Sequence, residues 1–148
     1  MANWRLGFTG THLGMTVQQE ATLRKLLASK IVFEFHHGCC VGADAQAHGI
    51  AHDLHIKKVL HPPVNPAKRA LCELDPGDVE LPKKPYLDRD HDIVDNTDVL
   101  IAAPASTRED IRSGTWATVR YARRKGRVIM MIDPDGNLRR DGECQKLA

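Results

Sequence analysis

The chain carries the apolar run VLIAAP at residues 99–104, followed at residues 112–118 by RSGTWAT. The first segment has the continuous apolar character of a strand that is covered on both faces. The second starts with small and hydroxyl residues and opens a helix-like segment that ends at Gly126. α/β folds hold phosphate with such a loop, because backbone N–H groups and the positive end of the helix dipole face the anion. The two segments therefore predict an α/β fold with a phosphate-binding loop.

The composition indicates one soluble globular domain. The 148 residues suffice for a single hydrophobic core and are too few for two ordinary domains. A net charge of +2 lacks the basic excess of a dedicated duplex-DNA binder. The longest uncharged apolar run, residues 128–132, is too short to span a membrane, and the first residues lack the apolar core of a signal peptide. The four cysteines are interpreted as free thiols, so we expect a cytoplasmic protein without membrane association.

Strand-like and helix-like segments alternate along the chain. We expect strands at residues 4–8, 31–36, 57–61, 98–103 and 127–132, and helices at residues 16–29, 43–54, 87–96 and 112–125. Thr16, with Gln19 three residues later, predicts a capping box for the first helix, and Val17 is expected on its buried face. Leu87 is expected among the apolar members of the third helix.

The alternation predicts a single Rossmann-like domain over residues 1–134, with a mainly parallel five-stranded sheet and helices on both faces. Residues 135–148 are expected to form a turn-rich tail or an added hairpin. Residues 62–86 contain six prolines and little periodicity, which is typical of a lid, a binding loop or a mobile segment.

Three loops are predicted to meet at one edge of this sheet. Parallel α/β sheets bind ligands at the carboxyl ends of their strands, near the switch in strand order. The loops after the first, second and fourth predicted strands lie on that edge. They contain the candidate ligand-binding residues Thr9, Gly10, Thr11, Gly38, Gly42, Asp44, Ser113, Gly114, Thr115 and Thr118.

The candidate residues each have a functional and a structural interpretation. Gly114 and Thr115 let backbone and hydroxyl groups approach a phosphate, whereas Ser113 can be a plain helix cap. Gly38 and Gly42 suit a tight turn with or without a ligand. Asp44 can hydrogen-bond a ribose hydroxyl or cap its own helix.

Metal binding is not predicted from the spacing of the histidines. His48, His52 and His55 share a helical face with Asp44, and a His-x-x-x-His pair can hold zinc, but the sequence places no third ligand. We therefore expect neither a metal nor a cofactor. The adjacent Cys39 and Cys40 are either a reactive thiol at a helix N-terminus or small apolar fillers, and the filler interpretation is favoured.

Two blocks of the sequence resemble a known superfamily. The block HGCCVGADAQAH at residues 37–48 is similar to the Gly-x-x-x-Gly-x-Asp-x-x-Ala-His block of DNA-processing protein A and to YspA-type proteins. SGTWAT at residues 113–118, with the following Gly126 and Arg127, resembles the Ser-Gly-Ser-x-x-Thr-Ala block and Gly-Arg of the same proteins. Arg89 and the strand after Asp98 look like a block of the LOG phosphoribohydrolases. These families form the SLOG superfamily, so the resemblance implies a Rossmann-like fold and a phosphate-bearing ligand.

One departure from the LOG pattern concerns catalysis. LOG enzymes read Gly-Gly-x-Gly-Thr-x-x-Glu with a catalytic glutamate, and Thr118 stands at that position here. Glu109 or Asp110, in an insertion that LOG enzymes lack, can replace the missing carboxylate, or the two can belong to a solvated loop. Arg89 can fix a phosphate or carboxylate with its planar guanidinium, or pair with neighbouring aspartates on a helix surface. Arg89 and Glu109 are thus the candidate catalytic residues.

The leading prediction is binding of a nucleotide or nucleotide-derived small molecule. The first alternative is hydrolysis of a nucleotide N-glycosidic bond. The second is binding of single-stranded nucleic acid, as in the DNA-processing proteins, which is less favoured because only 5% of the residues are aromatic. A basic strip at residues 120–127 either complements the helix dipole or follows a nucleic-acid backbone. The resemblance also implies a homodimer.

Overall fold

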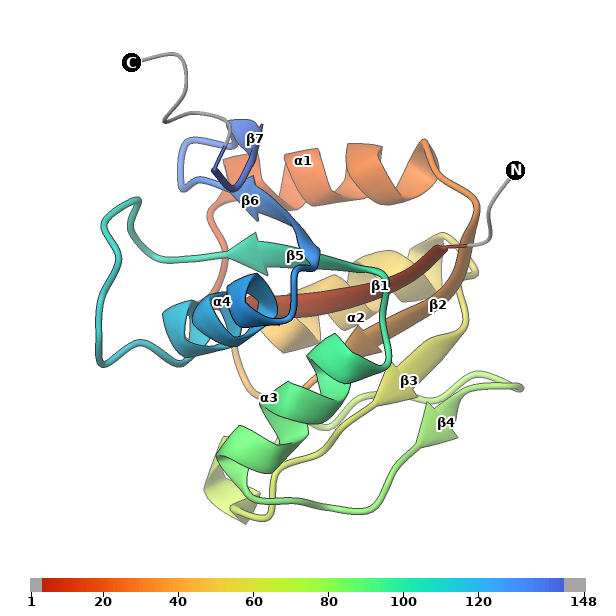
Figure 1. Ribbon diagram of the computed structural model, residues 1–148. Coiled ribbons are helices and arrows are strands. Elements are labelled where there is room, and N and C mark those ends of the chain that lie inside the picture. Colours follow the sequence, from red (N-terminus) through yellow and green to blue (C-terminus); the bar gives the residue numbers. More distant parts are fainter. Residues whose placement is uncertain (1–3, 143–148) are drawn as a thin grey trace.

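The computed structural model describes residues 4–142, which form one seven-stranded sheet covered by helices on both faces (Figure 1). The strands are β1 (Trp4–Gly10), β2 (Val32–His37), β3 (Lys58–Leu60), β4 (Val79–Glu80), β5 (Val99–Ala103), β6 (Val128–Ile132) and β7 (Leu138–Arg140). The helices are α1 (Val17–Ala28), α2 (Ala43–Asp53), α3 (Tyr86–Asp95) and α4 (Gly114–Arg124), with a short 3-10 helix, η1 (Pro66–Lys68). The predicted α/β Rossmann-like fold is confirmed.

The strand count was predicted too low. The order across the sheet is β4-β3-β2-β1-β5-β6-β7, parallel except for β7, which runs antiparallel to β6. The two strands beyond the predicted five, β4 and β7, lie at the edges and contain only two and three residues. Strand β7 falls in the segment where an added hairpin was one expectation. Short polar edge strands carry no hydrophobic alternation, so the sequence pattern does not reveal them. The residues after the turn at residues 134–137 thus form a hairpin, whereas residues 143–148 lie outside the described chain.

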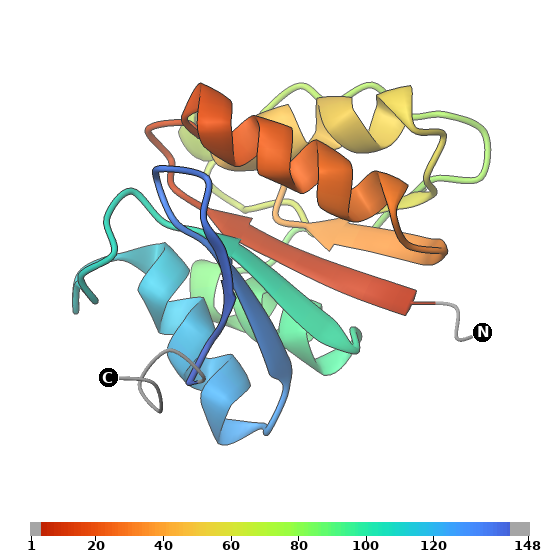
Figure 2. The same ribbon diagram turned by 90° about the horizontal axis from the view of Figure 1, so that it is seen from above.

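Strand β5 contributes to two separate hydrophobic cores. Val99, Ile101 and Ala103 pack on the side of α1 and α2, whereas Leu100 and Ala102 pack on the side of α3 and α4. Figure 2 shows these two pairs of helices on opposite sides of the sheet. Because both faces of the strand are buried, every residue in it is apolar.

Gln19 connects helix α1 to the carboxyl ends of two strands. The predicted capping box is present: the Thr16 hydroxyl accepts the Gln19 amide N–H, and the Gln19 side chain accepts the Thr16 N–H. The buried Gln19 Nε2 also donates to the carbonyls of Pro104 (2.8 Å) and Ile132 (3.0 Å). Gln19, the N3 residue of the capping box, therefore ties α1 to the ends of β5 and β6. Val17, expected on the buried face, is exposed because it occupies the first helical position, beyond the sheet contact.

The proline-rich segment 62–86 is anchored along much of its length. It supplies η1 and the edge strand β4. Its Lys68 carbonyl accepts the Val41 N–H, and its Ala70 N–H donates to the Cys39 carbonyl, both at 2.9 Å. These bonds place the segment against the loop between β2 and α2.

The remaining expectations concern the membrane, the exposure of one helix residue, and the oligomeric state and location of the protein. Within residues 4–142, no helix combines the length and apolar character needed to cross a lipid bilayer. Leu87, expected among the apolar residues of α3, is exposed because it lies on the outer face of that helix. The homodimer and the cytoplasmic location stay predictions.

The buried ion pairs of Lys58 predict a specific loss of stability. Its fully buried ammonium lies 2.7 Å from Asp75 and 3.2 Å from Asp78, both in the proline-rich segment. Lys58→Ala leaves the nearly buried Asp78 carboxylate without its cation, which we expect to lower the free energy of unfolding by about 3 kcal/mol. Urea unfolding measures this loss. The control is Lys57→Ala, which removes a half-exposed ammonium that pairs with Glu34 and lies over the Phe33 ring; equal losses in both variants would contradict the prediction.

Candidate functional site

The strand order switches between β1 and β5, and a cleft of about 840 Å³ lies at the carboxyl ends of the strands. The loops after β1, β2 and β5 meet there, as the sequence predicted. The predicted residues that line it are Thr9, Gly10, Thr11, Gly38, Asp44, Arg89, Ser113, Gly114 and Thr115. The structure therefore brings three loops, far apart in the sequence, into one concave site.

Gly42 holds two of these loops together without lining the cleft. Its φ of +96° lies in the left-handed region, and a Cβ there would come within 2.3 Å of the His12 carbonyl oxygen. The next residue, Ala43, donates its N–H to the Thr11 carbonyl at 3.0 Å. Only glycine permits this close crossing of the first loop over the start of α2.

The predicted phosphate loop is the capped N-terminus of α4. The Ser113 hydroxyl accepts the Trp116 N–H at 3.3 Å, so the structural interpretation of this serine holds as well. A Cβ at residue 114 would meet the Tyr86 hydroxyl, so Gly114 leaves room for this side chain. Burial raises the pKa of Tyr86 to about 12, so its hydroxyl keeps its proton at neutral pH. The helix N-terminus and this hydroxyl together present hydrogen-bond donors to the cleft.

Arg89 lies in the wall of the cleft and is almost fully buried. Its Nη1 donates to the Gly38 carbonyl at 2.7 Å, and its Nη2 lies 3.9 Å from Asp90 Oδ1. Its Nε has no hydrogen-bond partner in the structure. A Cβ on Gly38 would lie 1.9 Å from Nη1, so glycine at that position makes room for the guanidinium.

Two buried carboxyl groups accompany this cation. Burial raises the pKa of Asp44 to about 7 and that of Asp90 to about 6, although the charge of Arg89 acts in the opposite direction on both. Asp44 Oδ2 accepts the Cys40 N–H at 3.2 Å, as expected for a carboxylate near a helix start. Asp90 Oδ2 has no hydrogen-bond partner. The cleft thus holds one buried cation and two acids that titrate near neutral pH.

Cys40 lines the cleft as a protonated thiol. Burial and the nearby Asp44 charge raise its pKa to about 11. A thiol with such a pKa is a poor nucleophile, because the thiolate is the reactive form. The structure therefore favours the filler interpretation at this position.

Three comparisons place this architecture among known structures. The molybdenum cofactor binding protein of Rippkaea orientalis aligns with a TM-score of 0.68 and 19% identity over 90% of this chain and 78% of its own. The Moco carrier protein of Chlamydomonas reinhardtii aligns with a TM-score of 0.63 and 18% identity over 88% and 76%. DNA processing protein A from Helicobacter pylori aligns with a TM-score of 0.60 and 18% identity over 86% and 64%.

The chain has the Rossmann-like α/β fold of these structures. No protein-family model matches the chain, and no curated protein matches it by sequence. The fold is therefore established by structure, and the ligand has to be argued from the cleft itself.

Thr118, which the sequence resemblance puts at the position of the LOG glutamate, does not line the cleft. Its buried hydroxyl donates to the Gly114 carbonyl at 3.0 Å and contacts the Asp90 carboxyl. Asp90, from the neighbouring helix α3, therefore supplies a carboxyl group beside the residue that replaces the glutamate.

Glu109 is not brought to the cleft. Its carboxylate pairs with Arg123 at 2.8 Å and with Arg120 at 3.3 Å. The hydrogen bond from Arg123 lowers its pKa, as expected for a surface ion pair. The contacts of Glu109 are those of the structural interpretation, a charged surface loop.

The sequence reasoning missed Asp90 and Tyr86. Asp90 stands in the acidic run DRDHD at residues 88–92, where charge alone does not tell which aspartate is buried. The helical period indicates which aspartate is buried, because Arg89 and Asp90 precede the core residues Ile93 and Val94 by four positions. Tyr86 carried no such signal, since its contact with Gly114 depends on how α3 and α4 pack.

The raised pKa of Asp44 predicts a pH dependence of stability. The folded protein binds this proton more tightly than the unfolded chain, whose pKa is near 3.8, so the free energy of unfolding falls as the pH rises from 3.8 to about 7. The side-chain oxygen of the Asp44→Asn variant can still accept the Cys40 N–H. We expect the free energy of unfolding of this variant to fall less over the same pH range. Urea unfolding at pH 5 and pH 7.5 measures it. Asp53→Asn, at an exposed surface pair, is the control; an identical pH dependence in Asp44→Asn and wild type would refute the assignment.

Proposed function

We propose that the cleft binds a nucleotide or a nucleotide-derived small molecule through its phosphate. The observation that carries the proposal is the buried Arg89 guanidinium, whose Nε lacks a partner in the wall of the cleft. Unpaired buried charged donors are costly, and guanidinium groups are suited to phosphate and carboxylate oxygens. A phosphate in the cleft would add negative charge beside this cation.

The N-terminus of α4 supports the same assignment. Ser113, Gly114 and Thr115 line the cleft in the first turn, where helix N–H groups lack intrahelical partners. In our proposal the phosphate lies on this turn, within reach of the Tyr86 hydroxyl. The ribose lies near Gly38 and Asp44, and residues 9–11 close the pocket.

The structural neighbours agree with a ligand-binding role. Two of them are named for binding or carrying the molybdenum cofactor, and the Helicobacter pylori protein is described in its single-stranded DNA binding mode. Identities of 18–19% carry the fold alone, so the class of ligand proposed here rests on the cleft.

Hydrolysis of the N-glycosidic bond is a second candidate function, and Asp90 is the observation that favours it. This buried carboxyl lies beside Arg89 and Thr118, and its pKa of about 6 suits proton exchange near neutral pH. In this reaction water adds its hydroxyl to the ribose carbon and its proton to the departing base, giving free base and ribose phosphate. Asp90 would take the proton from water, so this carboxyl, rather than Glu109 or Asp110, would stand in for the missing glutamate.

Single-stranded nucleic-acid binding is less favoured by the contacts of the basic strip. Arg123 is held by Glu109 and by Asp141, and Arg127 Nε donates to the Val94 carbonyl at 3.2 Å. These cations are engaged within the molecule, so fewer of them are available to a phosphate backbone.

Phosphate recognition predicts a matched pair of binding results. Among nucleoside monophosphates, the tightest ligand should bind at least about tenfold more tightly than its nucleoside, and Gly114→Asp should lose about 10- to 100-fold in affinity, as expected for one charged hydrogen bond. The control is Gly49→Asp, at an exposed helical glycine with no atom near its Cβ position. Titration calorimetry measures the affinities of wild type and of the two variants for the nucleotide and its nucleoside. Equal affinities for nucleotide and nucleoside, or for the Gly114→Asp variant and wild type, would remove the proposal.

Hydrolysis predicts release of free base that depends on Asp90. We expect Asp90→Asn to abolish the release while retaining nucleotide binding, because only the proton acceptor is lost. Asp92→Asn, on the same helix but paired with Lys84 outside the cleft, and Glu109→Gln should remain active. Chromatography of the reaction products from a panel of nucleotides measures the release of base. If the wild-type protein releases no base from any of these nucleotides, it is not a hydrolase of this class.

A further inference from the structure

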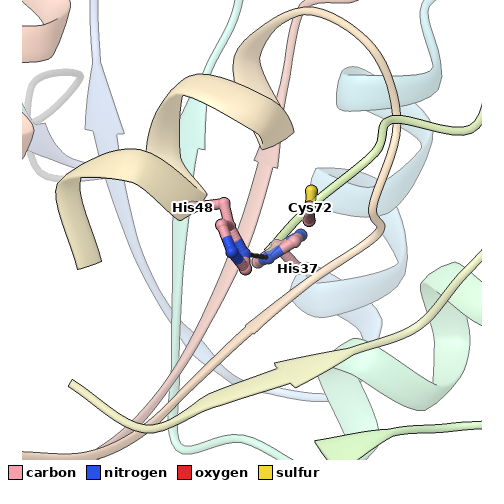
Figure 3. Close-up of side chains that lie close together, drawn as sticks. All are labelled: His37, His48 and Cys72. Carbon is pink, nitrogen blue, oxygen red and sulfur yellow. Dashed lines mark hydrogen bonds between the residues drawn. The ribbon is translucent and has the colours of Figure 1, made fainter. Parts of the chain in front are cut away.

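A second group of side chains with metal-binding chemistry lies behind the cleft. One ligand atom from each of His37, His48 and Cys72 lies within 4.8 Å of the other two. They come from the end of β2, from α2 and from the proline-rich segment. Figure 3 shows the two rings joined by a hydrogen bond, with Cys72 next to His37. The sequence analysis considered His48 together with His52 and His55 as a zinc face; in the structure His52 contacts Asp75.

The histidines are oriented by a chain of hydrogen bonds. His48 Nε2 lies 2.6 Å from the Glu73 carbonyl, which can only accept, so Nε2 donates and Nδ1 keeps a lone pair. That lone pair faces His37 Nε2 at 2.9 Å. Histidines that bind metals usually donate their other ring N–H to a carbonyl or carboxylate, as His48 does here. Zn–N bonds of about 2.0–2.1 Å place two tetrahedral nitrogen ligands about 3.3 Å apart, so the rings need separate by only a few tenths of an ångström.

Cys39 adds a fourth soft ligand. Its buried thiol interacts with the Cys72 thiol and donates to the Ala70 carbonyl at 3.5 Å. Its Sγ is not one of the three atoms that lie within 4.8 Å of one another, so it reaches the ion by turning away from Ala70. Both cysteines are free. Two thiols and two imidazoles form a Cys2His2 donor set, which binds zinc in preference to magnesium or calcium.

We propose that His37, His48, Cys72 and Cys39 form a structural binding site for Zn²⁺. The ion joins the proline-rich segment to the end of β2 and to α2, directly behind Gly38 and Cys40 of the cleft. Its role is to hold the segment in place, as closed four-ligand zinc sites do.

Binding requires a defined movement of protons. The two thiol protons leave to water as two Zn–S bonds form. The proton on His37 Nε2 moves to Nδ1, which now accepts the Cys39 N–H at 3.0 Å. The Cys39 amide must therefore turn away; its φ of 53° already lies in the left-handed region that non-glycine residues rarely adopt. This tautomer change distinguishes coordination from a purely structural hydrogen-bond chain.

The test uses the full chain, reduced and freed of metal with a chelator. Titration with Co²⁺ should give one ion per chain with thiolate-to-cobalt charge-transfer absorption, and Zn²⁺ should displace it. Cys72→Ser and His48→Gln should each weaken Zn²⁺ binding on the order of 100-fold or more. Cys40→Ser and His52→Gln, a thiol and a histidine outside the cluster, should bind as wild type does. On addition of Zn²⁺, ¹⁵N spectra of the histidine rings should show the His37 proton moving to Nδ1.

Wild-type protein without cobalt–thiolate absorption would overturn the proposal, whatever the variants do. Cys72→Ser that binds Zn²⁺ as tightly as wild type would overturn it too, as would an unchanged His37 tautomer. If the ligand variants do not fold, the stoichiometry, the absorption and the tautomer of the wild type decide alone.

Discussion

The burial of the Arg89 guanidinium is the constraint on which the cleft depends. A charge removed from water has to be met by acceptors. The Gly38 carbonyl accepts one of its N–H groups, and Asp90 lies at the edge of ion-pair distance. This position of the arginine depends on Gly38, because any Cβ at residue 38 would occupy the place of Nη1. Helix α3 and the loop after β2 are therefore fixed relative to each other by one side chain.

The same burial sets the chemistry of the cleft. Asp44 and Asp90 lose water as Arg89 does, and desolvation outweighs its attraction, so both pKa values rise toward neutrality. An anionic ligand that satisfies Arg89 Nε would favour the protonated form of these acids further. In the proposed complex, anion binding and proton uptake by these acids would therefore be linked.

Features that depend on local pattern could be predicted, and features that depend on packing could not. The apolar run of β5, the capping box at Thr16 and the glycine loops predicted the Rossmann-like fold and the edge where the cleft lies. The edge strands β4 and β7 are too short for a period to appear. Three contacts join residues that are far apart in sequence or carry no pattern. They are Tyr86 with Gly114, Cys72 with His48, and Glu109 with Arg123. Spacing along the chain therefore located the site without giving its complete set of side chains.

The central claim is that a phosphate-bearing ligand occupies the cleft at the carboxyl ends of β1, β2 and β5. Amide chemical shifts followed by ¹H–¹⁵N NMR during titration with a nucleoside monophosphate test it most directly. The account predicts the largest changes at residues 9–11, 38–44 and 113–115, together with the Arg89 Nε–H resonance. Changes confined to the basic strip at residues 120–127, with the cleft amides unmoved, would contradict it.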